Sequence, residues 1–300
     1  MEKIKLTFLG TGQAIPTEKR NHTAILLQYA DENILVDCGE GTQRQFRKAK
    51  LNPCKLTRLL ITHWHGDHIL GLPGLLQTLA LNAYNKTLEV YIPKGTAHFF
   101  QLIQRMFVYK DAIKLNLNEV EPGTIFETSK FKIEAETMKH DTPCLAYSFV
   151  EKDKIRIDKG KMKKLGIKPG PLLKQIKQGK SIKLKDNVIK PEDLTYEEKG
   201  RKITFILDTI TNENAVKLAK NSDLLVCEST YTEQEKDLAK EYKHLTAKQA
   251  AEIAKKSNSK KLILTHISQR YDYKEKFLLE EAKKIFKSSE VAEDLTSLEL

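Results

Sequence analysis

The chain has 300 residues, 40 % of them apolar and 30 % charged, which is typical of a soluble protein that can bury a core. No apolar run approaches the roughly 20 residues that span a bilayer, and the opening MEKIKLTFLG lacks the apolar centre of a signal peptide, so we expect no membrane partner. The four cysteines form no CxxC pair, which favours reduced thiols in a cytoplasmic protein over a disulfide framework.

Apolar runs with strand-like patterns occur in both halves of the chain. In the first half they predict strands at 3–9, 24–29, 33–37, 56–62, 88–93 and 131–140, and in the second half at 202–209, 223–230 and 260–266. Helical periodicity predicts helices at 43–50, 68–81, 97–107, 213–220, 247–256 and 274–286. Because strands alternate with helices in both halves, we expect one α/β domain, residues 1–300, with two sheets and helices outside them.

The net charge of +11 is concentrated in one segment. Residues 154–190 hold thirteen lysines and arginines against two aspartates, so the rest of the chain is formally balanced. The surrounding segment, 150–200, also contains several glycines and prolines and few apolar residues. We expect an inserted extension without a second core, which is either a solvated flexible segment or a surface for a polyanion.

Metal-binding residue types are concentrated in the stretch THWHGDH, residues 62–68, which directly follows an apolar strand. His63 and His65 project to the same side if this stretch is extended, because side chains alternate along a strand. The glycine that follows permits a turn, which would aim Asp67 and His68 at a second position. A lone HxH is a weak signal, whereas HxHxDH after a strand is a strong one.

Three later residues, His140, Asp208 and His266, each stand at the end of an apolar strand, where α/β sheets build their sites. One metal is expected to bind His63, His65 and His140, the other to bind Asp67, His68 and His266, with Asp208 as the bridge. Seven ligands are too many for one zinc ion, which takes about four. Imidazole and carboxylate ligands without thiolate favour two zinc ions per subunit, with manganese and iron as alternatives.

Two metals that share a hydroxide favour attack on an ester, amide or phosphodiester. Asp67 can orient the water and accept its proton, and the leaving group then needs an acid. The candidate acid is His244, which lies just before Thr246 and Gln249, a T-x-x-Q capping box that begins a helix. Glu228, at the end of a strand, is the candidate to orient it. The alternative is that His244 is a surface residue and that Glu228 caps or pairs locally.

Three other residues near these motifs have simpler interpretations. Asp37 ends a strand and is expected to hold the ligand loop by hydrogen bonds rather than to bind metal. Trp64, between two predicted ligands, is expected to pack beneath them. A structural role is favoured for His22, with RNA contact as the alternative.

Six segments together resemble the short form of the ribonuclease Z family, the tRNA 3′-processing endonucleases of the metallo-β-lactamase superfamily. They are VDCGEGTQRQF (36–46), THWHGDHILGLPGLL (62–76), KPGPLLKQIKQGK (168–180), LDT (207–209), HLT (244–246) and THIS (265–268). The resemblance implies an αββα sandwich with a protruding basic arm, and a zinc-dependent endoribonuclease. Such an enzyme removes the 3′ trailer from precursor tRNA by metal-hydroxide phosphodiester hydrolysis and leaves a 3′-OH on the tRNA.

The same resemblance implies that Glu228 and His244 are the proton-transfer pair. It also implies a homodimer, in which the arm of one subunit grips the tRNA that the other cuts. The chain departs from the family at Leu207, where a glycine is usual, and at Glu18 of the PTEKRN loop, where a lysine is usual. That loop is linked in the family to sensing CCA ends, and Arg20 of this chain still matches.

Two other hypotheses remain at this stage. A small-molecule hydrolase of the same fold, such as a lactonase or a thioesterase, has no use for the basic segment 154–190. An RNA-binding protein that keeps a structural metal site has no use for His244. Cleavage of 3′-extended precursor tRNA, compared with lactone and thioester hydrolysis, distinguishes the three.

Overall fold

The computed structural model describes residues 2–108, 113–184 and 187–300. The chain divides into two compact units. The larger, called here the sandwich unit, comprises Met1–Phe126, Ile133–Phe149 and Lys202–Leu300. The smaller, called the basic unit, comprises Glu127–Lys132 and Val150–Arg201.

One seven-stranded sheet is built mainly from the N-terminal half of the chain. Its strand order is β18 (Ser297–Glu299), β1 (Ile4–Gly10), β2 (Ala24–Tyr29), β3 (Glu32–Val36), β4 (Arg58–Leu60), β5 (Thr87–Pro93) and β6 (Lys114–Val120). Neighbours from β18 to β3 are antiparallel, whereas those from β3 to β6 are parallel. One apolar cluster joins residues of this sheet, such as Leu35 and Leu59, to Phe46 of α1 (Thr42–Lys48), Leu75 of α3 (Leu72–Leu81) and Phe100 of α4 (Ala97–Met106).

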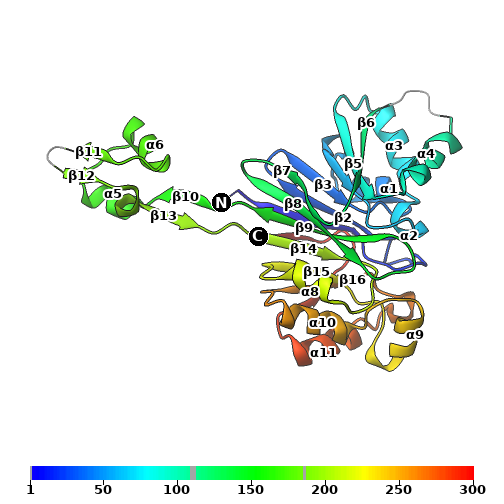
Figure 1. Ribbon diagram of the computed structural model, residues 1–300. Coiled ribbons are helices and arrows are strands. Elements are labelled where there is room, and N and C mark those ends of the chain that lie inside the picture. The colour runs from blue at the N-terminus through cyan, green and yellow to red at the C-terminus, as the bar shows by residue number, and fades with distance from the viewer. Residues whose placement is uncertain (1, 109–112, 185–186) are drawn as a thin grey trace. The chain divides into compact units, whose positions relative to one another are not determined.

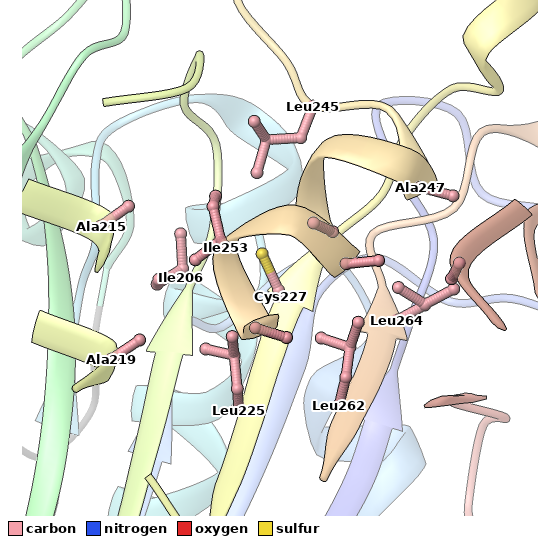
Figure 2. Close-up of a cluster of buried hydrophobic side chains, with 14 of the residues drawn as sticks. Ile206, Ala215, Ala219, Leu225, Cys227, Leu245, Ala247, Ile253, Leu262 and Leu264 are labelled. Carbon is pink, nitrogen blue, oxygen red and sulfur yellow. The ribbon is translucent and has the colours of Figure 1, made fainter. Parts of the chain in front are cut away.

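The second seven-stranded sheet is completed by the C-terminal half. Its order is β17 (Ser289–Val291), β16 (Leu262–Thr265), β15 (Leu224–Glu228), β14 (Lys202–Ile206), β9 (Cys144–Glu151), β8 (Phe131–Met138) and β7 (Gly123–Glu127). Its covering helices are α8 (Glu213–Ala219), α10 (Ala247–Lys256) and α11 (Lys276–Ile285). In α10, alanines 247, 250, 251 and 254 are fully buried at the spacing of one helical face, and this face packs on β15 and β16 (Figure 2).

The two sheets meet through their other faces. The hydroxyl of Tyr147 in β9 donates to the carbonyl of Ile61 at 2.7 Å, next to the end of β4. The rings of Tyr29 in β2 and Phe149 in β9 pack edge to face with centroids 5.2 Å apart. The two groups of helices lie on opposite sides of the paired sheets (Figure 1). The expected αββα sandwich is therefore confirmed.

The predicted elements agree with the structure except in a few places. Each predicted strand overlaps an observed one, but β6, β7, β9, β17 and β18 of the sandwich unit and the four strands of the basic unit were not predicted. The predicted helix 68–81 is two helices, α2 (Gly66–Ile69) and α3, because the amide of Gly71 donates to the carbonyl oxygen of Cys38 at 2.9 Å rather than to a carbonyl one helical turn earlier. A Cβ at Gly71 would lie 2.0 Å from the carbonyl oxygen of Gly39. The remaining helices of this unit are η1 (Pro53–Lys55), η2 (Glu233–Glu235), α9 (Lys236–Glu241) and η3 (Gln269–Tyr271). No helix in the described ranges has the length and hydropathy that crossing a membrane requires.

Among its described residues, the basic unit has two pairs of antiparallel strands and three short helices. They are β10 (Lys154–Ile157) with β13 (Thr195–Glu198), β11 (Ile182–Leu184) with β12 (Asn187–Ile189), α5 (Lys159–Lys164), α6 (Pro171–Lys177) and α7 (Pro191–Leu194). Its own apolar cluster is formed by Ile167, Ile176, Ile182, Ile189 and Leu194. The expectation of a segment without a core was therefore wrong. The five aliphatic residues are too widely spaced to form a recognisable periodic pattern, and the packing of α6 and α7 with β11 and β12 brings them together.

Candidate metal centre

Two predicted site residues, Asp208 and His266, follow parallel strands whose carboxyl ends share one edge of the second sheet. Strands β14, β15 and β16 are parallel, with Ile206 opposite Cys227 and Glu228 opposite Thr265. Asp208 and His266, which come just after β14 and β16, therefore stand on either side of the end of β15. Parallel strands bring side chains together at this edge because their carboxyl ends coincide.

The backbone has positive φ at three residues that follow strands, one after β3 of the first sheet and two after β14 and β16 of the second. The φ values are 57° at Asp37, 24° at Asp208 and 57° at His266. Positive φ is uncommon outside glycine, although aspartate and histidine adopt it more readily than most residues. Local hydrogen bonds support the conformation, since the amide of Thr209 donates to Oε1 of Glu228 at 2.7 Å. Such strained positions are concentrated at functional sites.

The seven predicted metal ligands lie together in the sandwich unit. Three overlapping groups have ligand atoms within 4.8 Å of one another: His63, His65, His140 and Asp208; Asp67, His68 and His266; and Asp208, His244 and His266. The first two groups match the division expected from the sequence. Oδ2 of Asp208 is 3.5 Å from Nε2 of His63, and its Oδ1 is 3.2 Å from Nε2 of His266. Asp208 thus faces both groups, as a bridging ligand must.

The polar atoms of the cluster fit bound cations. Nε2 of His68 lies 3.2 Å from Nε2 of His266, and Nδ1 of His65 lies 3.2 Å from Nε2 of His140. Nε2 of His63 and Oδ1 of Asp208 are buried and accept or donate no hydrogen bond within the described residues. Buried polar atoms are normally paired, so ring nitrogens and a carboxylate that converge unpaired suit a metal ion.

The side chains of the cluster shift one another's pKa values strongly. Burial opposes ionisation, but the neighbouring histidines, His266 and His68 first, hold the pKa of Asp208 well below its usual range. Burial likewise opposes ionisation of Asp67, but the charge of His68 holds the pKa of that carboxyl below its usual range. Burial and the charge of His68 together lower the pKa of His63 well below its usual value, which keeps that imidazole neutral. Metal binding requires ionised carboxylates, which these are, and neutral imidazoles, so a bound cation would take over the charge that the raised pKa of His68 places in this cluster.

Glu228 and His244 form a buried pair beside the cluster. Oε2 of Glu228 lies 3.2 Å from Nδ1 of His244, and the side chains are 0 % and 6 % exposed. Burial opposes protonation, but the carboxylates of Glu228 and Asp208 raise the pKa of His244 to about 9. The predicted capping box of Thr246 and Gln249 is confirmed and positions His244 at the start of α10. His244 is therefore not the surface residue of the alternative interpretation.

Asp37 and His22 have structural roles, as expected, and Trp64 packs against the apolar cluster of the first sheet. Asp37 accepts hydrogen bonds from the amide of Thr62 at 2.8 Å and from its hydroxyl at 2.7 Å, which holds the ligand loop. Trp64 packs against Phe99 with ring centroids 5.5 Å apart. His22 is buried, with Nε2 3.0 Å from the carbonyl oxygen of Ala14.

The PTEKRN loop is held by buried polar contacts. Arg20 is 3 % exposed and donates to the hydroxyl of Thr11 and to the carbonyl of Ala292, the latter at 2.8 Å. It also pairs with Glu275 at 3.2 Å. These contacts give Arg20 a structural role.

Two residues near the predicted ligands were missed from the sequence. Oδ1 of Asp141 is 3.3 Å from ring nitrogens of both His65 and His140, although its position next to His140 was a signal. The hydroxyl of Thr230 donates to Glu228 at 2.7 Å and lies 3.1 Å from Nδ1 of His266. Thr230 contacts both Glu228 and His266 only because β15 and β16 are neighbours.

Comparison with solved structures shows the same fold. The short form of human tRNase Z superposes with a TM-score of 0.70 and 29 % identity, over 98 % of each chain. The metallo-beta-lactamase fold protein YhfI from Bacillus subtilis has a TM-score of 0.72 and 19 % identity over 100 % of each chain, which shows the fold alone. A family model described as "Anti-Pycsar protein Apyc1" matches residues 4–157, which include THWHGDH and His140 but not Asp208.

Full-length sequence similarity is more specific. The ribonuclease Z of Methanothermobacter thermautotrophicus is 40 % identical to this chain over 298 residues, which cover 99 % of this chain and 97 % of the relative. The alignment therefore includes the basic unit and the C-terminal strand ends as well as the half that carries THWHGDH. On this evidence, the chain belongs to the ribonuclease Z family.

Proposed function

We propose that this chain is a divalent-metal-dependent endoribonuclease that removes the 3′ trailer from precursor tRNA. The observation that carries the proposal is the Glu228–His244 pair beside seven converging histidines and aspartates, in a chain of the ribonuclease Z family. A metal cluster alone would suit many hydrolases, because this fold supports many reactions. The adjoining proton-transfer pair and the basic unit are what favour an RNA phosphodiester.

The seven residues His63, His65, Asp67, His68, His140, Asp208 and His266 are proposed to hold two zinc ions. Ions bound there would lower the pKa of water and stabilise charge on phosphoryl oxygens. Asp67, which the charge of His68 keeps ionised, is proposed to orient the attacking water and take its proton. Manganese and iron remain alternatives for the same ligands.

His244 is proposed as the acid for the leaving group. Its Nδ1 faces Glu228, which leaves Nε2 to donate a proton to the departing oxygen. Hydrolysis forms a bond between the water oxygen and phosphorus and breaks the bond from phosphorus to O3′ of the tRNA. The 3′ oxygen takes the proton of His244, so the tRNA keeps a 3′-OH and the trailer keeps the phosphate. Glu228 stabilises the protonated imidazole before transfer.

The basic unit is proposed as the arm that binds the tRNA backbone. Its exposed lysines at 159, 161, 163, 164, 168, 174, 177, 180, 183 and 190 form no ion pair with any described residue. By contrast, Arg156 pairs with Glu198 at 2.7 Å. Cations without internal partners are available to phosphates, and counterion release would then contribute affinity.

We also propose a cytoplasmic homodimer. The four cysteines are free, which supports a reducing compartment. Exposed apolar side chains on α4 support a subunit contact, since Phe99, Leu102 and Met106 are 39 %, 57 % and 67 % exposed. Light scattering at several protein concentrations tests the dimer, and a constant monomer mass contradicts it.

The function is tested by incubating metal-replete protein with a 3′-extended precursor tRNA and mapping both new ends. A single cut that leaves a 3′-OH on the tRNA and a 5′-phosphate on the trailer is the expected result. A lactone and a thioester serve as control substrates. Hydrolysis of either control with an uncut precursor would overturn the proposal in favour of a small-molecule hydrolase.

A further inference from the structure

A cavity of about 420 Å³ in the sandwich unit adjoins His244. Its lining residues are Ile210, Thr211, Lys236, Asp237, Lys240, His244 and Gln249. None of the seven proposed metal ligands is among them, so this is a space beside the reacting centre rather than the centre itself. Its volume lies in the range of roughly 300–1,000 Å³ that small-molecule sites occupy, and a single nucleotide is a ligand of this class.

His244 indicates which part of an RNA substrate this cavity faces. An acid must approach the atom that it protonates within about 3 Å. In the proposed reaction that atom is O3′ of the last tRNA nucleotide, because the phosphate remains with the trailer. The nucleotide that carries this oxygen therefore lies next to His244, and His244 is also part of the cavity lining.

The two lysines of the cavity suit a phosphate. Lys236 and Lys240 are four residues apart on α9, so they share one helix face. Both are exposed and neither forms an ion pair with any described residue. Asp237 is the one acidic residue in the lining. Two unpaired cations on one face give this wall of the cavity a positive charge suited to the backbone of a nucleic acid.

Two other residues of the lining suit a nucleobase rather than a phosphate: Gln249 offers a hydrogen-bond donor and Ile210 an apolar surface. Oε1 of Gln249 accepts from the amide of Thr246 at 2.9 Å as part of the capping box. This bond orients the side chain and leaves the two amide hydrogens on Nε2 without an acceptor among the described residues. Ile210, which is half-buried, offers an apolar surface for a ring. An apolar surface beside an oriented donor is suited to a nucleobase, whose face is apolar and whose edge accepts hydrogen bonds.

We propose that this cavity binds the last nucleotide of the tRNA, the one whose 3′ oxygen leaves. The base packs on Ile210 within reach of the Gln249 amide, and Lys236 and Lys240 neutralise the phosphate on its 5′ side. This assignment rests on the function proposed above. It makes these residues determinants of which nucleotide precedes the cut, whereas the metal cluster treats every phosphodiester alike.

Abasic substrates test the assignment directly. One precursor tRNA lacks the base of its last tRNA nucleotide, and a second lacks the base of the first trailer nucleotide. Since base packing is worth about 1–3 kcal/mol per base, the first change should lower kcat/KM of the wild-type protein by about 5- to 150-fold. The second should have a much smaller effect. Equal rates on the first substrate and on the intact precursor, or a larger loss on the second, would overturn the assignment.

Variants of the lining provide the second test. Lys236→Ala with Lys240→Ala should raise KM, and should reduce the slope of log affinity against log salt by about 0.7 for each phosphate that is no longer neutralised. Lys220→Ala is the matched control, because Lys220 is also exposed and unpaired but does not line this cavity. If the double variant has the same KM and the same salt slope as the Lys220→Ala control, the proposed role of the two lysines is overturned.

Gln249→Glu keeps an acceptor for the Thr246 amide and removes the two donors of Nε2. It should change the relative rates on precursors that end the tRNA in A, G, C or U, with metal content and melting temperature close to those of the wild type. Unchanged base preference overturns the role of Gln249. If the wild-type protein cuts no precursor at all, the proposed function itself fails, which is a different result from a cut that ignores the last base.

Discussion

Oδ2 of Asp37 lies 2.6 Å from Nδ1 of His68, and both side chains are fully buried. Because a carboxylate accepts the Nδ1 hydrogen, Nε2 of His68 is directed at the neighbouring ring of His266. The same carboxylate binds the amide and hydroxyl of Thr62, so one residue holds both ends of the THWHGDH stretch. A carboxylate that orients a ligating histidine in this way tunes the metal site without binding the metal.

Asp37→Asn should therefore weaken metal binding by about 10- to 100-fold, the usual effect of removing such a partner. The amide has nearly the same shape, but it presents a donor where Nδ1 and Thr62 need acceptors. Competition with a metal chelator measures the affinity. An affinity equal to that of the wild type would mean that Asp37 serves the fold only.

Asp208→Ala should lower occupancy at both proposed metal positions, because Asp208 faces both groups of ligands. Metal analysis of the purified variant should find fewer than two equivalents, with neither position fully retained. His65→Ala is the comparison, since His65 belongs to one group only. Two full equivalents bound to the Asp208 variant would exclude it as the bridge.

His244→Ala should reduce the rate of precursor cleavage by about 10²- to 10⁴-fold, the usual contribution of a positioned acid. Metal content should be unchanged. A phosphodiester with a nitrophenyl leaving group should suffer less, because its leaving group departs without a proton. Single-turnover rates on the metal-replete variant make the measurement, and an equal reduction on both substrates contradicts the role.

Removal of the basic unit should weaken tRNA binding and flatten its salt dependence. Ile155 and Glu197 are opposite one another in the antiparallel pair β10–β13, so an Asn-Gly turn can replace residues 156–196. The salt slope should fall by about 0.7–0.9 for every phosphate that the unit neutralises. The proposed metal ligands lie in the sandwich unit, so hydrolysis of a small phosphodiester should persist. Unchanged tRNA affinity and slope at two salt concentrations would exclude the arm.

Asp294 should contribute a pH dependence to stability. Burial raises the pKa of its carboxyl from 3.8 to about 6, despite hydrogen bonds from Thr11 and the amide of Asn21. The folded protein then binds this proton more tightly than the unfolded chain, so the contribution is present below about pH 4 and is lost as the pH rises through 6. The free energy of unfolding, measured in urea, should fall less for Asp294→Asn than for the wild type between about pH 4 and pH 6. Equal falls in the free energy of unfolding over this pH range would contradict the prediction.

The sequence by itself determined the features that depend on near neighbours. Residue types and spacing in THWHGDH are local, and so is the placement of His140, Asp208 and His266 at the ends of apolar strands. The capping box at Thr246 follows from two residues three apart. The block of charge in 154–190 is a property of composition, which folding does not change.

Only the tertiary structure decided which of these residues meet. The contact of Glu228 with His244 depends on how α10 and the preceding loop pack on β15, and that of Thr230 with His266 depends on the pairing of β15 with β16. The break at Gly71 also depends on tertiary structure, because the carbonyl that accepts its amide belongs to Cys38, a residue distant in the sequence. Strand order and register are set by the burial of whole sheet faces, and no short stretch of sequence carries that information.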